Sequence, residues 1–341
     1  MTNKQFFKRS LVFILLAVAI NTLLNFGYNR GMFYFRQCRV QDEQFRNYPD
    51  TLKYLMLGNS HNRIDPALLG NGFSYIMPKE VYTQTYYKLK YILEKTNKKP
   101  EYIFLSIDPV NFSPRVEKEM AFDGYWRKFV NYFELLRERN DPGYFRNWLD
   151  GYFFSYAGNY RYMLMSVVFR KTDLGLIKNG YIPARNYRNF SKEPDRESLG
   201  FKIATVYLSS YGGISTLEDT RSYQKILTLC RQHKIHLILL RMPFTDEYLK
   251  YARRMINLDQ LDREIVALTR KYCDDFIVFD FRNDFKGKPE LFFNADHINP
   301  DGASIVSNKI KEELSKIKDF KEVTGSTFRS ESGSAACPKS R

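Results

Sequence analysis

The sequence predicts an α/β domain built around a mainly parallel, five-stranded sheet. Two observations predict this fold. Short apolar runs alternate with longer segments of helical periodicity, and the runs are apolar at nearly every position, as strands buried on both faces are. The five runs that fit strands are residues 53–57, 73–77, 102–107, 236–240 and 276–279. Ligands of such sheets bind beyond the carboxyl ends of the strands.

The helices expected between these strands follow from apolar residues spaced three and four apart. They cover residues 79–95, 222–232, 246–273 and 301–317. Residues 115–200 break the alternation because they are rich in Tyr, Phe, Trp and Arg, and we interpret them as a mainly helical insertion. Residues 318–341 are rich in Ser, Gly and Lys, which predicts a disordered tail. The α/β domain therefore spans residues 51–317.

An apolar run near the N-terminus predicts insertion into a membrane. Residues 11–26 are mostly apolar. Three basic residues precede the run: Lys4, Lys8 and Arg9. Basic residues in this position place the N-terminus in the cytoplasm and the rest of the chain outside. We expect residues 1–27 to form a cytoplasmic tip and a single-pass anchor in the cytoplasmic membrane, with residues 28–50 as a juxtamembrane connector. The globular domain then lies on the periplasmic or extracellular side. A cleaved signal peptide, with Ala-Val-Ala at residues 17–19 as its cleavage site, is the alternative.

The chain is basic, with a formal net charge of +15 over 341 residues. This excess indicates an anionic partner, such as a membrane surface or an acidic polymer, or else a surface charge that only aids solubility. No nucleic-acid-binding module accompanies the charge, so we expect no nucleic-acid partner. The cysteines lack the CxxC spacing of zinc sites, and no acidic cluster accompanies His233 and His236. We therefore expect no metal and no cofactor.

Two segments far apart in the sequence carry the candidate chemistry. Residues 55–61 (Leu-Met-Leu-Gly-Asn-Ser-His) form an apolar run that ends in a tight turn. Residues 293–302 (Phe-Asn-Ala-Asp-His-Ile-Asn-Pro-Asp-Gly) hold a histidine among carboxylate and amide side chains. Ser60 follows the first strand and His297 follows the fifth, so a parallel sheet brings both to one edge. A serine nucleophile needs a base, and the base needs an orienting partner. The pair therefore predicts an acyl-group hydrolase or transferase.

On these motifs the chain resembles the SGNH, or GDSL-like, hydrolase family. Residues 58–60 (Gly-Asn-Ser) are similar to the family's Gly-Asp-Ser turn after the first strand. Residues 294–297 (Asn-Ala-Asp-His) are similar to its Asp-x-x-His block before the last helix. The resemblance covers about residues 53–317 and implies a three-layer SGNH-like domain, with residues 115–200 as an insertion.

More narrowly, the chain looks like the membrane-anchored members that act with membrane-bound O-acyltransferases. These include proteins that transfer D-alanine to teichoic acid and proteins that acetylate cell-surface polysaccharides. The resemblance implies an exported protein that moves an acyl group, most simply acetyl, to a cell-envelope glycan, with a membrane-bound O-acyltransferase as its partner. The alternatives are a carbohydrate esterase or deacetylase, and a non-catalytic subunit of an envelope acylation complex.

The expected catalytic residues are Ser60 as nucleophile, His297 as base and Asp296 as acid. The family's acid stands three residues before the histidine, and this chain has Asn294 there. An Asn can hold a histidine tautomer but cannot stabilise an imidazolium with charge, so Asn294 is a second candidate for orienting His297. Two further carboxylates could reach in from the end of the fifth strand: Asp280 and Asp284.

Other residues near the strand ends complete the expected site. The oxyanion donors expected are the backbone N–H of Ser60 and the side chain of Asn111. The third strand ends at Asp108, where the resemblance calls for an Asn. We expect His61 to pack against or cap a helix that begins near residues 63–69, and the alternative is that it lines the pocket. Arg241, at the end of the fourth strand, is expected to contact an anionic substrate or to form a salt bridge at the edge of the core.

Overall fold

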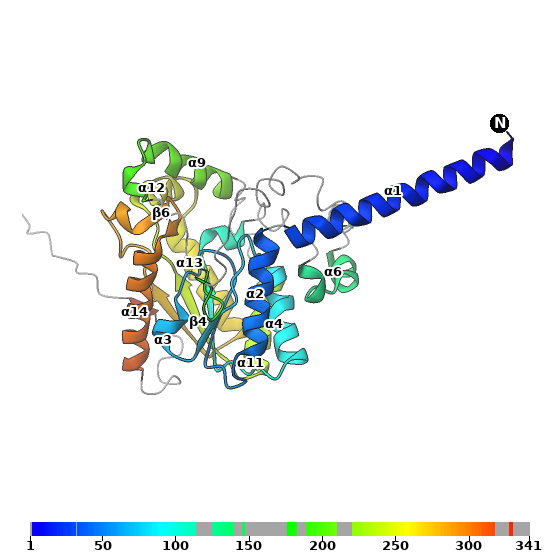
Figure 1. The fold of residues 1–341 in the computed structure, drawn as a ribbon. Coiled ribbons are helices and arrows are strands. Elements are labelled where there is room, and N and C mark those ends of the chain that lie inside the picture. Colours follow the sequence, from blue (N-terminus) through cyan, green and yellow to red (C-terminus); the bar gives the residue numbers. More distant parts are fainter. Residues whose placement is uncertain are drawn as a thin grey trace, which may run out of the picture. The chain divides into compact units, whose positions relative to one another are not determined.

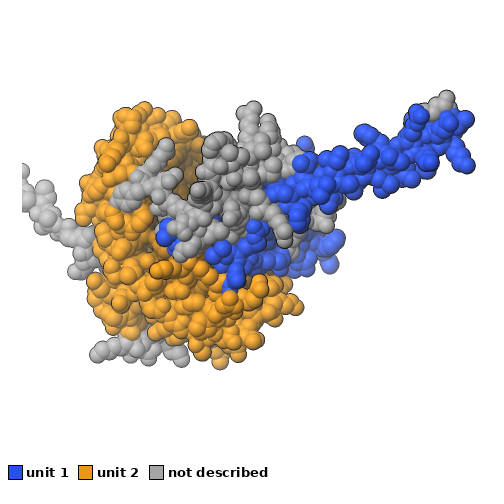
Figure 2. Space-filling view, viewed as in Figure 1, with its two compact units in different colours: residues 1–43, 121–176 blue, residues 44–120, 177–341 orange. Residues whose placement is uncertain are grey.

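The computed structural model describes residues 2–31, 33–113, 125–139, 145–146, 176–182, 189–209, 220–317 and 327–329. The chain divides into two compact units (Figure 2). Unit 1 comprises residues 1–43 and 121–176, and unit 2 comprises residues 44–120 and 177–341. The two segments that carry the candidate chemistry both lie in unit 2.

Unit 1 begins with a long apolar helix, α1 (Asn3–Gly31). Its stretch Asn3–Tyr28 is long and apolar enough to cross a membrane, and large apolar side chains along it are exposed. This agrees with the predicted anchor in length and composition, while the side of the membrane on which the chain continues stays a prediction. Most of the predicted connector is helical, because α2 (Phe33–Asn47) covers it.

The predicted insertion lies largely outside the described residues. Its described helices are η2 (Trp126–Lys128) and α6 (Tyr132–Arg139) in unit 1, and η4 (Phe190–Lys192) and the start of α9 (Arg196–Leu208) in unit 2. An antiparallel bridge between Lys178 and Tyr181 is also described in unit 2. In unit 1 the aromatic residues Tyr125, Trp126 and Phe129 are buried and contact one another. These rings therefore pack in a core.

The sheet of unit 2 is parallel, in the order β2-β1-β3-β4-β5. Its strands are β1 (Tyr54–Leu57), β2 (Gly72–Ser74), β3 (Tyr102–Ser106), β4 (His236–Arg241) and β5 (Phe276–Asp280). The prediction of five mainly parallel strands is confirmed, although β2 is shorter than expected. A sixth strand, β8 (Thr327–Arg329), pairs in parallel with β5. It lies within the segment predicted to be disordered, which is therefore ordered at these three residues.

Helices cover both faces of this sheet, which explains why its strands are apolar throughout. Figure 1 shows α3 (Pro66–Leu69) and α14 (Pro300–Lys316) on one side of the strands and α4 (Tyr82–Lys95) and α11 (Arg221–Gln232) on the other. Alternate residues of each strand face opposite sides. Met56, Phe104 and Ile238 share one core with residues of α14, including Val306 and Ile310.

One predicted helix is divided in two, and a side-chain cap explains the break. Residues 246–273 form two helices, α12 (Asp246–Met255) and α13 (Leu258–Tyr272). The break occurs because Asn257 accepts the N–H of Gln260 at 3.0 Å and so starts a new helix. The helix after Ser60 begins at Pro66, within the predicted range, and the carboxylate of Asp65 caps it by accepting the N–H of Ala67. Ser60 thus does not lie at a helix N-terminus.

Candidate active site

Ser60 lies in a turn at the carboxyl end of β1. This is the edge of the sheet at which the sequence predicts the site. Gly58 has a φ of 103°, a left-handed backbone conformation that favours glycine and turns the chain out of the strand. The side chain of Asn62 fixes the turn by donating to the carbonyl oxygens of Leu57 at 2.9 Å and of Phe104 at 3.1 Å. The turn is thereby tied to the ends of β1 and β3.

His297 comes from a short antiparallel hairpin that precedes α14. The hairpin strands are β6 (Phe292–Asn294) and β7 (His297–Ile298), and Asn299 then caps α14 by accepting the N–H of Gly302 at 3.0 Å. This arrangement brings Nε2 of His297 to 2.8 Å from Oγ of Ser60. The pairing of Ser60 with His297 expected from the sequence is thus present within hydrogen-bond distance.

The other ring nitrogen of His297 contacts both candidates for its orienting partner. Nδ1 lies 2.8 Å from Oδ1 of Asp296 and 3.1 Å from Oδ1 of Asn294. Because Asn294 also accepts the backbone N–H of Asp296 at 3.2 Å, its amide oxygen and not its nitrogen faces the histidine. Two acceptors at Nδ1 indicate that the proton sits there. Nε2 is then free to accept the hydrogen of the Ser60 hydroxyl.

Two other carboxylates that the sequence offered for this role are engaged elsewhere. Asp280 accepts a hydrogen bond from Arg241 at 3.0 Å, and Asp284 accepts one from Lys309 at 2.6 Å. Arg241 also lies 3.3 Å from Asp262, so of its two expected roles the structure gives it the salt bridge at the edge of the core.

His61 links the site to a second buried carboxylate. Its Nε2 lies 3.3 Å from Oδ2 of Asp296, and its Nδ1 lies 3.3 Å from Oδ2 of Asp108. His61, Asp108 and Asp296 are all buried, and the His61 ring meets the His297 ring edge to face. The expectation that His61 packs or caps a helix is therefore corrected: it bridges two carboxylates. The sequence signal was its place next to Ser60, together with Asp108 at the end of the neighbouring strand.

The charges of this cluster set the protonation of each member. Burial lowers the pKa of His61, but the hydrogen bonds to Asp108 and Asp296 outweigh burial and raise the pKa to about 9. Burial raises the pKa of Asp296, but the two histidines hold the pKa well below its usual range. Burial and the charge on His61 lower the pKa of His297, and Asp296 opposes them. At neutral pH the cluster therefore holds a charged His61, a charged Asp296 and a neutral His297.

The two expected oxyanion donors differ in their surroundings. Within the described residues, the backbone N–H of Ser60 makes no hydrogen bond and so stays available. The amide nitrogen of Asn111 donates to the carbonyl oxygen of Ser106 at 2.7 Å, and its oxygen accepts from the side chain of Asn59. Asn59 in turn accepts the N–H of His61 at 3.0 Å. Asn111 thus braces the turn through Asn59, and its role as an oxyanion donor stays a prediction.

His61, Asp296 and His297 present side-chain atoms that lie within 4.8 Å of one another and could together hold a metal ion. Those same atoms make the hydrogen bonds that direct His297 toward Ser60. A metal ion held there would have to replace these hydrogen bonds. His236, flagged by the sequence only weakly for metal binding, instead lies with Nδ1 2.7 Å from Asp275.

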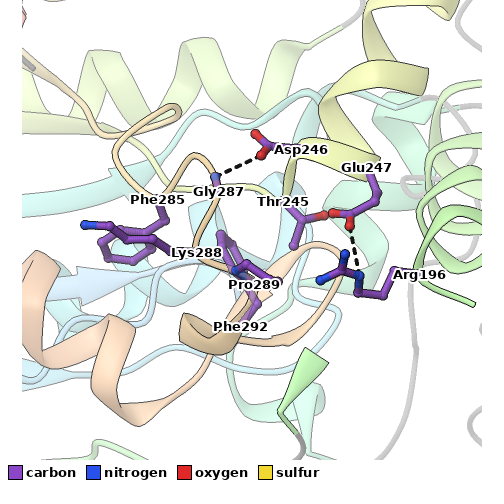
Figure 3. A pocket seen from close by; sticks show the side chains of 9 residues that line it. All are labelled: Arg196, Thr245, Asp246, Glu247, Phe285, Gly287, Lys288, Pro289 and Phe292. Carbon is purple, nitrogen blue, oxygen red and sulfur yellow. Dashed lines mark hydrogen bonds and ion pairs between the residues drawn. The ribbon is translucent and has the colours of Figure 1, made fainter. Parts of the chain in front are cut away.

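A separate cavity of about 290 Å³ opens elsewhere on unit 2 (Figure 3). Its lining residues are Arg196, Thr245, Asp246, Glu247, Phe285, Gly287, Lys288, Pro289 and Phe292. Arg196 pairs with Glu247 at 3.2 Å, and Asp246 accepts the N–H of Gly287 at 2.8 Å, so charged groups of this lining already have partners. Neither Ser60 nor His297 lines the cavity.

No protein-family model matches the chain, and no curated protein matches it.

Proposed function

We propose that this protein is an exported, membrane-anchored acyl-transfer protein that uses Ser60 as its nucleophile. One observation carries the proposal. The Ser60 hydroxyl, the His297 ring and the Asp296 carboxylate form a chain with 2.8 Å at each link. A serine, a histidine and an acid in this order are the parts of nucleophilic acyl transfer.

The chemistry proceeds in two halves. Nε2 of His297 takes the hydroxyl proton as Oγ of Ser60 attacks the carbonyl carbon of an acyl ester. The Ser60 N–H stabilises the developing oxyanion, and His297 returns the proton to the leaving alcohol, which leaves an acyl-serine. A hydroxyl of the acceptor then loses its proton to His297 and attacks the acyl-serine. Ser60 regains its hydrogen when the ester forms on the acceptor.

The charge of the cluster supports this cycle. Before the reaction, a positive His61 and a negative Asp296 lie next to a neutral His297. When His297 takes the proton, it becomes positive beside the negative Asp296. Burial strengthens this attraction because the local dielectric constant is low. Asp296 thereby stabilises the protonated His297 of the transition state and offsets part of the opposing effects of burial and of the charge on His61.

The proposed substrate is inferred from features of the chain outside the site. α1 is long and apolar enough to anchor the protein, and the net charge of +15 suits an anionic envelope polymer. Together with the resemblance to SGNH proteins that act with membrane-bound O-acyltransferases, these features support transfer of an acetyl group to a cell-envelope glycan. A carbohydrate esterase, using water as the acceptor, is the second candidate, because the same Ser60–His297 geometry serves hydrolysis.

The test uses the full chain with Ser60→Ala and His297→Ala, and with Ser315→Ala and His233→Ala as matched controls at exposed positions. We expect a serine-directed phosphonate to label the wild type and both controls but not Ser60→Ala. In cells, glycan O-acetylation is expected to disappear in the two site variants. In vitro, we expect turnover of a chromogenic acetate ester to fall by at least about 10³-fold, which is typical when a member of such a triad is removed.

The outcomes separate the candidate functions. Acceleration of acyl-serine breakdown by a glycan acceptor supports transfer. Full turnover with water alone and no effect of the acceptor supports the esterase. Unchanged O-acetylation in both site variants, together with no phosphonate label on the wild type, would overturn the proposal in favour of a non-catalytic subunit.

A further inference from the structure

Arg63 lies beside the nucleophile with its charge unpaired. Its Nε donates to the carbonyl oxygen of Ser60 at 3.1 Å, which turns the side chain back toward the Ser60 turn. Within the described residues, its two terminal nitrogens make no hydrogen bond and no ion pair. The side chain is half-buried, so the cation has lost part of its hydration without gaining a carboxylate.

Other buried arginines of unit 2 behave differently. Arg282 donates to both carboxylate oxygens of Asp262, at 2.7 and 2.8 Å, and Arg241 pairs with Asp280 and Asp262. These arginines sit at the end of β4 and just past the end of β5, at the same edge of the sheet as Ser60. Among the described residues, carboxylates thus pair with Arg241 and Arg282, and no carboxylate lies within ion-pair distance of Arg63.

The surroundings of Arg63 place its charge at the site. The positive charge of Arg63 acts on His297 and on Asp296, and Tyr181 lies close enough to interact with it electrostatically. Its Nε is already fixed on Ser60, so the two terminal nitrogens form a fork of donors in a set direction. Such a fork matches the two oxygens of a carboxylate or a phosphate.

We propose that Arg63 binds an anionic oxygen group of the substrate, a carboxylate or a phosphate, next to the ester that Ser60 attacks. The inference rests on the proposed function and narrows its substrate to an acidic glycan, whose charge lies on a sugar close to the acylated hydroxyl. Arg63 is then the residue that selects acidic over neutral glycans. The basic net charge of the chain would favour the approach of such a polymer.

The experiment measures binding apart from turnover. The full chain in detergent carries Ser60→Ala, so that no substrate is consumed, and calorimetry follows the binding of trigalacturonate, inorganic phosphate and maltotriose. We then add Arg63→Gln, Arg63→Lys or, as the control at an exposed arginine, Arg253→Gln. We expect Arg63→Gln to weaken binding of one anionic probe by about 10- to 100-fold, as loss of a charge-assisted hydrogen-bond pair does. Maltotriose binding and the Arg253→Gln variant are expected to stay unchanged, and Arg63→Lys to recover part of the affinity.

The two anionic probes distinguish a carboxylate-bearing from a phosphate-bearing glycan. Equal binding of both anionic probes with and without Arg63, in variants that unfold at the wild-type temperature, would overturn the inference. A second outcome would also overturn the inference. If Arg63→Gln, in the protein that keeps Ser60, lowered the turnover of neutral and of anionic acetate esters equally, Arg63 would act on the oxyanion of the reaction. Failure of the proposed function looks different: Arg63-dependent binding would persist in a protein whose Ser60 never reacts.

Discussion

Two buried groups of charged residues meet at the Gly58 turn, and they differ in how completely their hydrogen bonds are satisfied. The first is the pair of Glu80 and Lys88, 2% and 0% exposed. Glu80 accepts from Lys88, from the Thr85 hydroxyl at 2.7 Å and from the Gly58 N–H, and Lys88 also donates to the carbonyl oxygen of Tyr75. The second is the site itself, where the Ser60 N–H and the end of Arg63 have no described partner.

The difference shows which property marks a site in this fold. Both groups are buried, charged and tied to the same turn, so burial and charge do not distinguish them. In the Glu80–Lys88 pair the two charges neutralise each other, and the hydrogen bonds of both side chains to backbone groups support the local structure. At the candidate site, the Ser60 N–H and the terminal nitrogens of Arg63 have no partner among the described residues. Unused hydrogen-bonding capacity, and not burial of charge, therefore distinguishes the candidate site from the structural pair.

The largest expected effect separates the two residues that contact Nδ1 of His297. Asp296→Asn keeps the shape of the side chain but removes the charge that stabilises the imidazolium, and we expect a loss of kcat on the order of 10³–10⁴-fold. Asn294→Ala removes one neutral hydrogen bond, so we expect only about a five- to tenfold loss. Ester turnover by the two purified variants measures both effects. A larger loss in Asn294→Ala than in Asp296→Asn would make Asn294 the main orienting residue.

The next effect tests whether the Glu80–Lys88 pair is structural. Lys88→Met leaves the buried Glu80 carboxylate without its cation, and we expect the free energy of unfolding to fall by about 3–5 kcal/mol. The double variant Glu80→Gln with Lys88→Met removes both charges and should recover most of this loss. Denaturant unfolding of the full chain in detergent gives the values. A double variant as unstable as the single one would show that the pair contributes through its hydrogen bonds and not through its charges.

The smallest expected effect concerns the coupling of His61 to His297. The charge on His61 lowers the pKa of His297. His61→Gln removes that charge, so the acidic limb of the kcat/KM profile should move upward, on the order of one pH unit. A limb that stays in place would show that the two rings are not electrostatically coupled.

His61→Gln is also expected to change how the stability of the protein depends on pH. The folded-state pKa of His61, about 9, lies above its ordinary value of 6.5. The stabilisation from its proton is therefore fully present below about pH 6.5 and is lost as the pH rises through about 9. The difference in unfolding temperature between the wild type and His61→Gln should narrow over this range. A constant difference would assign the effect of His61 to packing.

Local sequence signals were enough to predict the strands and the pair of Ser60 with His297. Each strand is a short apolar run, and the Gly58 turn follows one of them directly. The acid was harder to choose because neighbouring residues of a strand point to opposite faces. Ala295 and Asp296 form the turn of a hairpin and not a strand, so the Asp296 carboxylate can reach the ring of the next residue.

The role of His61 could not be predicted from local signals. Its partners stand 47 and 235 positions away, and only the register of the sheet and the path of the hairpin bring them together. Likewise, the break at Asn257 depends on whether a polar side chain caps a new helix or lies on the exposed face of a continuous one. The apolar periodicity is compatible with both.

The distance along the chain between Ser60 and His297 has a consequence for folding. The two residues are 237 positions apart, and a bond of 2.9 Å from the Asp65 N–H to the Ser307 hydroxyl ties the segment after Ser60 to α14. No local segment can assemble the triad, since closing so long a loop comes late in folding. The proposed activity, which needs both residues, therefore arises only after the sheet has closed. For the exported protein that we propose, reactivity would then wait until the chain has crossed the membrane.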